Sequence, residues 1–195
     1  EIWIEGAIAL CGLWVFMVHT VTARKPLFAP ELFADRNFAS AAVFMFIIGM
    51  VMFAAMALLP SLLEGLFGYP VVETGEILAS RGVGVLLTMA ISGRIVGKID
   101  PRLMVAGGFA LSTLSLWMMM GWSLEQGWMP FVITGLIQGL GIGLVFVPLQ
   151  VLAFGTLPPT ARTEGAAVLN LTRNIGSSIG IAVGVATVRV QLHPV

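Results

Sequence analysis

Basic and amide side chains inside apolar segments are the groups of this chain most suited to chemistry. Arg173 shares an apolar stretch with Asn170, Asn174 and Ser177, at the i, i+3, i+4 and i+7 spacing that puts side chains on one helix face. Inside a lipid bilayer such a charge is costly and usually functional. The stripe predicts a buried contact between helices, structural or transport-linked. The alternative is that Arg173 extends to the polar membrane edge.

Three further polar residues lie within apolar stretches, namely Arg81, Gln138 and Gln150. Arg81 follows Glu73 and Glu76, so it either anchors its segment at the membrane interface or lines a cavity open to the outside. Gln138 lies among glycines, where a buried amide needs a partner on another helix. The predicted substrate or translocation pathway therefore comprises Arg81, Gln138, Gln150, Asn170, Arg173 and Asn174.

Groups that serve enzymes and metal sites are scarce. The chain has two histidines, His19 and His193, and one cysteine, Cys11, too few for a convincing metal cluster. An enzyme would need His, Asp or Cys clustered near one membrane face, and the sequence contains no such cluster. The net charge is zero, which does not fit nucleic-acid binding. We expect no catalytic residue, no metal and no cofactor.

The composition shows what kind of fold must position these side chains. Of 195 residues, 58% are hydrophobic and 10% are charged, whereas soluble domains carry about 25% charged residues. The mean hydropathy is +0.99. Too few polar residues are present to cover a soluble fold, so the chain is expected to lie mostly in lipid. Because it begins at Glu1 inside an apolar stretch, we interpret it as an internal fragment of a larger membrane protein.

Six stretches are long enough to cross a bilayer, which takes about 20 helical residues. Lipid offers the backbone no hydrogen-bond partner, so these segments must be helices. The sequence thus predicts an all-α membrane protein. The six expected spans are Ile2 to Val21, then residues 38–63, 74–96, 103–122, 128–157 and 165–188.

Basic residues alternate between the connections. Arg24, Lys25 and Arg36 precede the second span, while the next connection carries glutamates and no Lys or Arg. The pattern repeats along the chain: the third connection is basic, the fourth holds only Glu125, and the fifth holds Arg162. Cytoplasmic loops are enriched in Lys and Arg. Connections one, three and five are therefore predicted to be cytoplasmic, in a multi-pass inner-membrane protein.

Small residues recur every four positions in the last two spans. Such ridges allow lipid-embedded helices to approach closely, and they serve static packing or sliding during a conformational cycle. Pro148 removes a helical hydrogen bond, so it either shapes the helix or acts as a gate hinge. The predicted packing and hinge residues are Gly135, Gly139, Gly143, Pro148, Gly176, Gly180 and Gly184.

Four motifs give the chain a family resemblance. They are PELFADRNF from Pro30, LLP from Leu58 followed by Gly68-Tyr69, GRIVGKIDPR from Gly93, and LPP from Leu157 followed by NLTRNIGSSIG from Asn170. The sequence resembles the fourteen-helix drug:proton antiporter branch of the major facilitator superfamily, and most closely the EmrB-type multidrug exporters. The resemblance covers nearly the whole chain, and the run from Asn170 is its most specific part.

The third motif, which contains Gly93, Arg94, Lys98, Asp100 and Arg102, resembles a degenerate copy of the cytoplasmic loop of that superfamily. It departs from the usual pattern, which carries Asp where Gly97 stands and Gly where Asp100 stands. The usual charge-relay role of the loop is therefore in doubt. The three basic residues are still expected to contact helix ends or partner acids.

The resemblance implies a division of the chain. Residues 1–37 resemble the last helix between the two halves with its cytoplasmic loop, and residues 38–195 resemble five helices of the C-terminal six-helix bundle. It implies export of drug-like apolar compounds against protons by alternating access. The implied partners are the missing N-terminal half of the chain, the lipid bilayer, a periplasmic adaptor and an outer-membrane channel. The alternatives are a narrow metabolite or siderophore substrate, and a non-transporting membrane scaffold.

Overall fold

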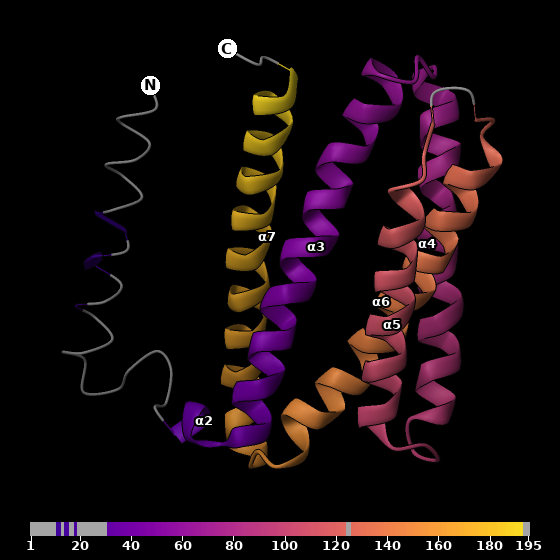
Figure 1. The fold of residues 1–195 in the computed structure, drawn as a ribbon. Helices are drawn as coiled ribbons and strands as arrows, with labels where there is room; N and C mark the ends of the chain where they lie inside the picture. The colour runs from indigo at the N-terminus through magenta and orange to yellow at the C-terminus, as the bar shows by residue number, and fades with distance from the viewer. Residues whose placement is uncertain (1–10, 13, 16–17, 19–30, 124–125, 193–195) are drawn as a thin grey trace.

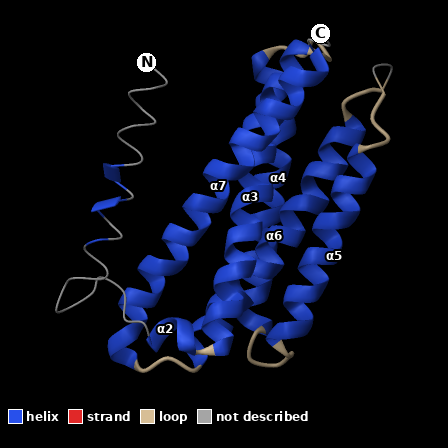
Figure 2. Cartoon of the chain, turned by 60° about the vertical axis from the view of Figure 1, so that its left-hand side comes forward, coloured by secondary structure: helices blue, strands red, loops and turns tan. Residues whose placement is uncertain are grey.

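The computed structural model describes residues 11–12, 14–15, 18, 31–123 and 126–192. Most of the first expected span, residues 2–21, lies outside these residues. The described elements are α2 (Glu31–Ala34), α3 (Arg36–Gly65), α4 (Val71–Ile95), α5 (Pro101–Met119), α6 (Met129–Gly155), the 3-10 helix η1 (Pro159–Ala161) and α7 (Arg162–Leu192). All regular structure in the described residues is helical (Figures 1 and 2).

Local sequence explains where these helices begin. Asp35 caps α3 by accepting hydrogen bonds from the backbone N–H groups of Asn37 and Phe38, at 2.8 and 3.1 Å, as side chains at this position typically do. Pro101 begins α5, where its missing N–H costs nothing. Between α3 and α4 the chain turns at Gly68, whose φ of 72° suits glycine best.

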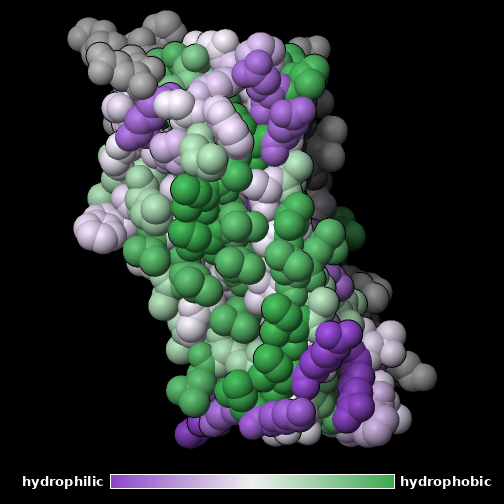
Figure 3. Space-filling model, turned by 90° about the vertical axis from the view of Figure 1, so that its right-hand side faces the viewer, coloured by the Kyte–Doolittle hydropathy of each residue, from purple (hydrophilic) through white to green (hydrophobic). Residues whose placement is uncertain are grey.

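The surface of the bundle is that of a membrane protein. Four helices (α3, α4, α5 and α6) are long and apolar enough to cross a bilayer. Figure 3 shows a green, hydrophobic belt on one face, with purple, hydrophilic residues toward both ends. The prediction of an all-α membrane protein is therefore confirmed. The fifth long helix, α7, is not among the four; its 31 residues include Arg162, Glu164 and Arg173.

The bundle is built from two groups of closely packed helices. Helix α7 packs along α3, whereas α6 packs along both α4 and α5. In Figure 1 the α3–α7 pair lies to the left of the other three helices. Helix α3 meets α6 less extensively and α4 hardly at all. We call the boundary between the α3–α7 pair and the α4–α5–α6 group the seam.

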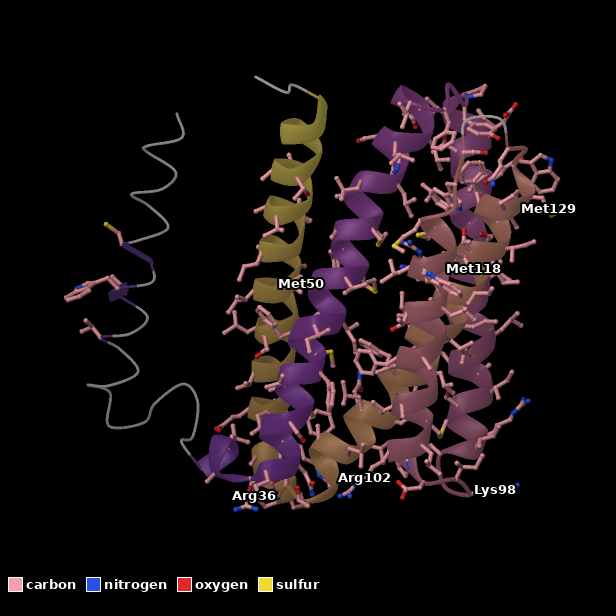
Figure 4. All side chains as sticks on the ribbon, in the orientation of Figure 1. Arg36, Met50, Lys98, Arg102, Met118 and Met129 are labelled. Atoms are coloured by element: carbon pink, nitrogen blue, oxygen red, sulfur yellow. The ribbon has the colours of Figure 1, made fainter. Side chains whose placement is uncertain are left out.

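Basic residues gather at one end of the bundle. Arg36, Lys98 and Arg102 lie near its lower end in Figure 4, while Met129 lies near the upper end. Arg94 at the last turn of α4 and Arg162 at the start of α7 belong to the same end by topology. We call this the basic end. It is the end that the sequence predicts to be cytoplasmic.

Helix α6 changes its neighbours along its length. Pro148 lies inside it and is fully buried, and proline cannot donate the hydrogen bond to the carbonyl four residues before it. In Figure 1 the C-terminal part of α6, in orange, runs obliquely from α4 and α5 toward the lower ends of α3 and α7. There Leu149 and Ala153 join the main hydrophobic core with Phe38 and Met45 of α3. This part of α6 bridges the seam.

Candidate translocation site

Arg81 and Gln138 form a buried polar pair between α4 and α6. Nη2 of Arg81 donates a hydrogen bond to Oε1 of Gln138. The Arg81 side chain is 7% exposed and that of Gln138 is 0% exposed. Each residue lies about 13–15 Å along its helix from the end opposite the basic end, at 1.5 Å per residue. Arg81 is therefore inside the bundle, where the sequence left open an interfacial position.

The surroundings of this pair are apolar and come from all four nearest helices. Leu59 and Leu63 of α3, Ile77 of α4, Met119 of α5 and Phe131 of α6 line the small space next to Arg81. Such surroundings give a guanidinium little hydration, so its interaction with any acceptor is strengthened by the low local dielectric.

Glycines hold α4 and α6 close enough for the pair to form. A Cβ at Gly139 would overlap the backbone carbonyl of Arg81, and one at Gly143 would come within 2.8 Å of the Val85 carbonyl. A Cβ at Gly135 would lie 2.7 Å from Oγ of Ser80. The three glycines thus mark the α4–α6 contact. On α7, a Cβ at Gly176 or Gly180 would overlap the backbone of α3, and Gly184 faces the Leu58 side chain.

Arg173 lies against an aromatic ring of α6. Its Cζ is 5.9 Å from the centroid of Phe146, within reach of a cation–π attraction. Its Nε is buried and has no hydrogen-bond partner among the described residues. The rest of the predicted stripe divides: Ser177 is buried, whereas Asn170 and Asn174 are exposed.

Gln150 lies beside Phe146, in an open cavity of about 440 Å³ along α6. The cavity also involves Met89 of α4, Phe154 of α6 and Arg162 of α7. Phe146 therefore connects Gln150 with Arg173. Arg81 and Gln138 are not among its lining residues, so the structure separates the predicted pathway residues into two places.

The loop motif lies at the basic end, with Arg94, Lys98 and Arg102 exposed. Asp100 caps α5 and accepts a hydrogen bond from the backbone N–H of Arg102 at 2.9 Å. That gives a physical reason for an aspartate at this position, directly before Pro101. A Cβ at Gly93 would have no atom within 4 Å, so this glycine has no close helix contact among the described residues.

A cavity of about 520 Å³ between α3 and α5 has no counterpart in the sequence reasoning. Apolar residues such as Phe44, Val105 and Phe109 line most of it, and Asn37 and Arg102 lie at its basic end. Residues of this kind are common in any membrane helix, so only the arrangement of the helices reveals the cavity. Within the described residues, no three His, Cys, Asp or Glu side chains are grouped as a metal site would require.

Comparison with known proteins places this geometry in a family. The chain is 29% identical over 190 residues to the multidrug export protein EmrB of Escherichia coli K12, covering 94% of this chain and 36% of that protein. It is 25% identical over 186 residues to the lincomycin resistance protein LmrB of Bacillus subtilis, covering 95% of this chain and 39% of LmrB. A multidrug resistance protein B homolog of Mycobacterium tuberculosis is 28% identical over 182 residues, covering 92% of this chain and 34% of that protein.

The chain thus spans a little over a third of the length of these relatives. The sequence also matches the Major Facilitator Superfamily over residues 2–188, nearly its whole length. With an all-helical bundle, an apolar belt and this match, the chain belongs to the Major Facilitator Superfamily of membrane transporters.

Proposed function

We propose that the chain is part of a transporter that exports drug-like, apolar compounds in exchange for protons by alternating access. The observation that carries this proposal is the similarity, over more than nine-tenths of the chain, to proteins named for multidrug export and drug resistance. Because the chain spans about a third of those proteins, substrate, coupling and partners are properties of the whole transporter.

The cavity beside Phe146 supports this function. Its lining combines aromatic and apolar side chains with few polar groups, namely Gln150 and Arg162, and the guanidinium of Arg173 lies over the Phe146 ring. Sites for drug-sized compounds typically have apolar walls and a small number of oriented polar groups. Gln150, Phe146 and Arg173 are therefore the proposed contacts for substrate in this part of the pathway.

The exposed amides of α7 indicate where the rest of the transporter lies. Asn170, Asn174 and Ser178 are exposed at i, i+4 and i+8 spacing, so they share one helix face. Amide groups are costly against lipid. In the proposal this face is covered by the half of the transporter outside the chain or by the water of the pathway, and residues 38–195 contribute to the C-terminal bundle.

The proposed setting is the inner membrane, with the basic end in the cytoplasm. Arg36, Lys98 and Arg102 at one end are the pattern expected for cytoplasmic loops. The family resemblance adds a periplasmic adaptor and an outer-membrane channel as proposed partners.

The test is drug movement by the full-length protein in proteoliposomes, with an imposed proton gradient. We expect ethidium transport that drives proton flux, reduced several-fold in Gln150→Leu. Gln126→Leu is the matched control, because Gln126 lies in the loop at the opposite end and donates to the Gly121 carbonyl. Proton-coupled movement of one metabolite or siderophore but not of drugs would favour a narrow substrate. No coupled movement of any of these compounds would favour a scaffold and overturn the proposal.

A further inference from the structure

We propose that Arg81 and Gln138 form a receptor for a carboxylate group at the seam. The carboxylate belongs either to a small compound with an apolar body or to an acidic side chain outside the described residues. The inference deepens the proposed function by naming a ligand chemistry, but binding at this pair can be measured without drug export.

The polar atoms of this pair that lack a partner are all hydrogen-bond donors. Gln138 Oε1, the only side-chain acceptor that the two residues possess, already accepts from Arg81. The atoms left without a partner among the described residues are Nε and Nη1 of Arg81 and Nε2 of Gln138. All three carry N–H groups and can only donate. The pair therefore presents donors and one positive charge, which an anionic acceptor satisfies best.

The described residues supply no counter-charge at this depth. Four glutamates of the described helices are exposed, and Asp100 is exposed at the basic end. Asp35 is only half-buried, and it too lies at the basic end. A buried charge without a partner is strongly unfavourable. The missing negative charge must therefore come from outside the described residues, and a carboxylate matches a guanidinium in charge and geometry.

The shape of the seam sets what can reach the pair. Gln138 also lines a cavity of about 140 Å³ between α3, α5 and α6. Its walls are mostly apolar, including Ile48, Phe109 and Ile142, and also contain the hydroxyl groups of Ser112 and Thr113. A dry apolar cavity of about 150 Å³ is large enough to bind benzene. A ring-sized apolar body therefore fits there, and in the proposal its carboxylate accepts a hydrogen bond from Nε2 of Gln138.

Direct contact with Arg81 requires some movement. The space beside Arg81 holds only about 10 Å³ and is closed by Leu59 and Leu63 of α3. Because α3 packs on α7 and hardly touches α4, a shift of α3 would widen the seam without disrupting the glycine contacts that hold α4 to α6. In the proposal the carboxylate enters as the seam widens and engages both residues.

The experiment uses purified full-length protein with benzoate and benzamide, which differ in charge but hardly in size. We expect benzoate to raise the thermal unfolding temperature and benzamide to leave it unchanged. Gln138→Glu places a carboxylate next to Arg81 from within, so it should fold and weaken benzoate binding at least about tenfold. Arg81→Gln should weaken it as much. Gln126→Glu, the same change outside the seam, should keep wild-type binding.

The two sources of the carboxylate give different results. Benzoate binding that depends on Arg81 and Gln138 supports a carboxylate compound as the ligand. If benzoate does not bind, suppressors of a transport-deficient Arg81→Gln variant are selected, and a suppressor that neutralises an acidic residue elsewhere in the chain supports an internal acid. The inference is overturned if benzoate and benzamide act alike in every variant and no such suppressor arises. Drug export that fails while benzoate still binds would instead count against the proposed function alone.

Discussion

The guanidinium of Arg173 lies over the aromatic ring of Phe146, joining α7 to the oblique C-terminal part of α6. The Cζ-to-centroid distance is 5.9 Å, and Arg173 Nε is buried without a partner among the described residues. The backbones of α6 and α7 come close at few places, so side-chain contacts such as this pair join the two helices. The cation–π attraction is worth about 0.5–2 kcal/mol, depending on how well the site excludes water.

The first prediction concerns this link. Phe146→Leu keeps an apolar side chain but removes the ring, so the full-length protein should lose about 1 kcal/mol of stability, and drug transport should fall. Phe146→Tyr keeps the ring and is the matched control. In an Arg173→Gln background the Phe146→Leu change should cost much less, as a double-mutant cycle of unfolding free energies would show. Equal costs in both backgrounds would mean that the two side chains do not interact.

The second prediction concerns the α4–α6 glycines. Gly139→Ala would push a Cβ into the backbone carbonyl of Arg81, which cannot move without separating the helices. We expect a loss of about 1–3 kcal/mol, measured as thermal stability of the full-length protein in detergent. Gly93→Ala, in the same bundle but facing open space, should be neutral or slightly stabilising because alanine favours helices. A Gly139→Ala variant as stable as Gly93→Ala would refute the close α4–α6 contact.

The third prediction concerns the bend of α6. Pro148→Ala would restore a backbone N–H able to donate to the carbonyl of Leu144, so α6 should straighten and its C-terminal part should move away from α3. Spin labels on α3 and on α6 beyond residue 148 should report a longer distance in the full-length protein. Transport should slow if this bridge moves during the cycle. Unchanged distances would show that packing by the core, not the proline, sets the path of α6.

The fourth prediction concerns pH. The pKa of the Asp35 carboxyl lies below its ordinary value of 3.8, because the Thr156 side chain and the backbone N–H groups of Phe38 and Asn37 hydrogen-bond to it. A lowered pKa means that the carboxylate stabilises the folded state above pH 3.8, and that this stabilisation is lost as the pH falls below it.

The matched variant for this test is Asp35→Asn, which can still cap α3 but does not titrate. Its stability should therefore fall less than that of wild type between pH 5 and about pH 3. Thermal unfolding of the full-length protein across this range is the measurement. Parallel pH profiles for the two proteins would show that the Asp35 carboxylate does not contribute to the pH dependence of stability.

Sequence reasoning succeeds here where lipid imposes strict rules. Apolar runs of helix length and a proline or aspartate at each helix start predict α3 to α6 well, because a bilayer leaves the backbone no alternative to the helix. The spacing of Gly135, Gly139 and Gly143 likewise places these residues on one face. The partner of that face depends on how the helices assemble, and no local pattern contains that information.

The candidate site shows the same limit. Arg81 could be recognised as unusual, but its burial against Gln138 depends on residues 57 positions apart in the chain. The stripe from Asn170 to Ser177 shares one helical face by spacing, yet the helix turns this face along the edge of α3, so Ser177 is covered while Asn170 and Asn174 are not. Helical spacing gives a direction around the axis, whereas burial depends on the neighbours in that direction.

The pairing of α3 with α7 has a consequence for biosynthesis. At about 5–20 residues per second, a ribosome takes roughly 5–20 s to make the hundred or so residues that separate the two helices. During that interval α3 has been released into the bilayer without its main neighbour, and the face around Gly49 that later contacts α7 is turned to lipid tails. It contains the most apolar segment of the four apolar helices, so it is stable in the bilayer before α7 is made. Final assembly of the bundle is thus delayed until the last described helix is inserted.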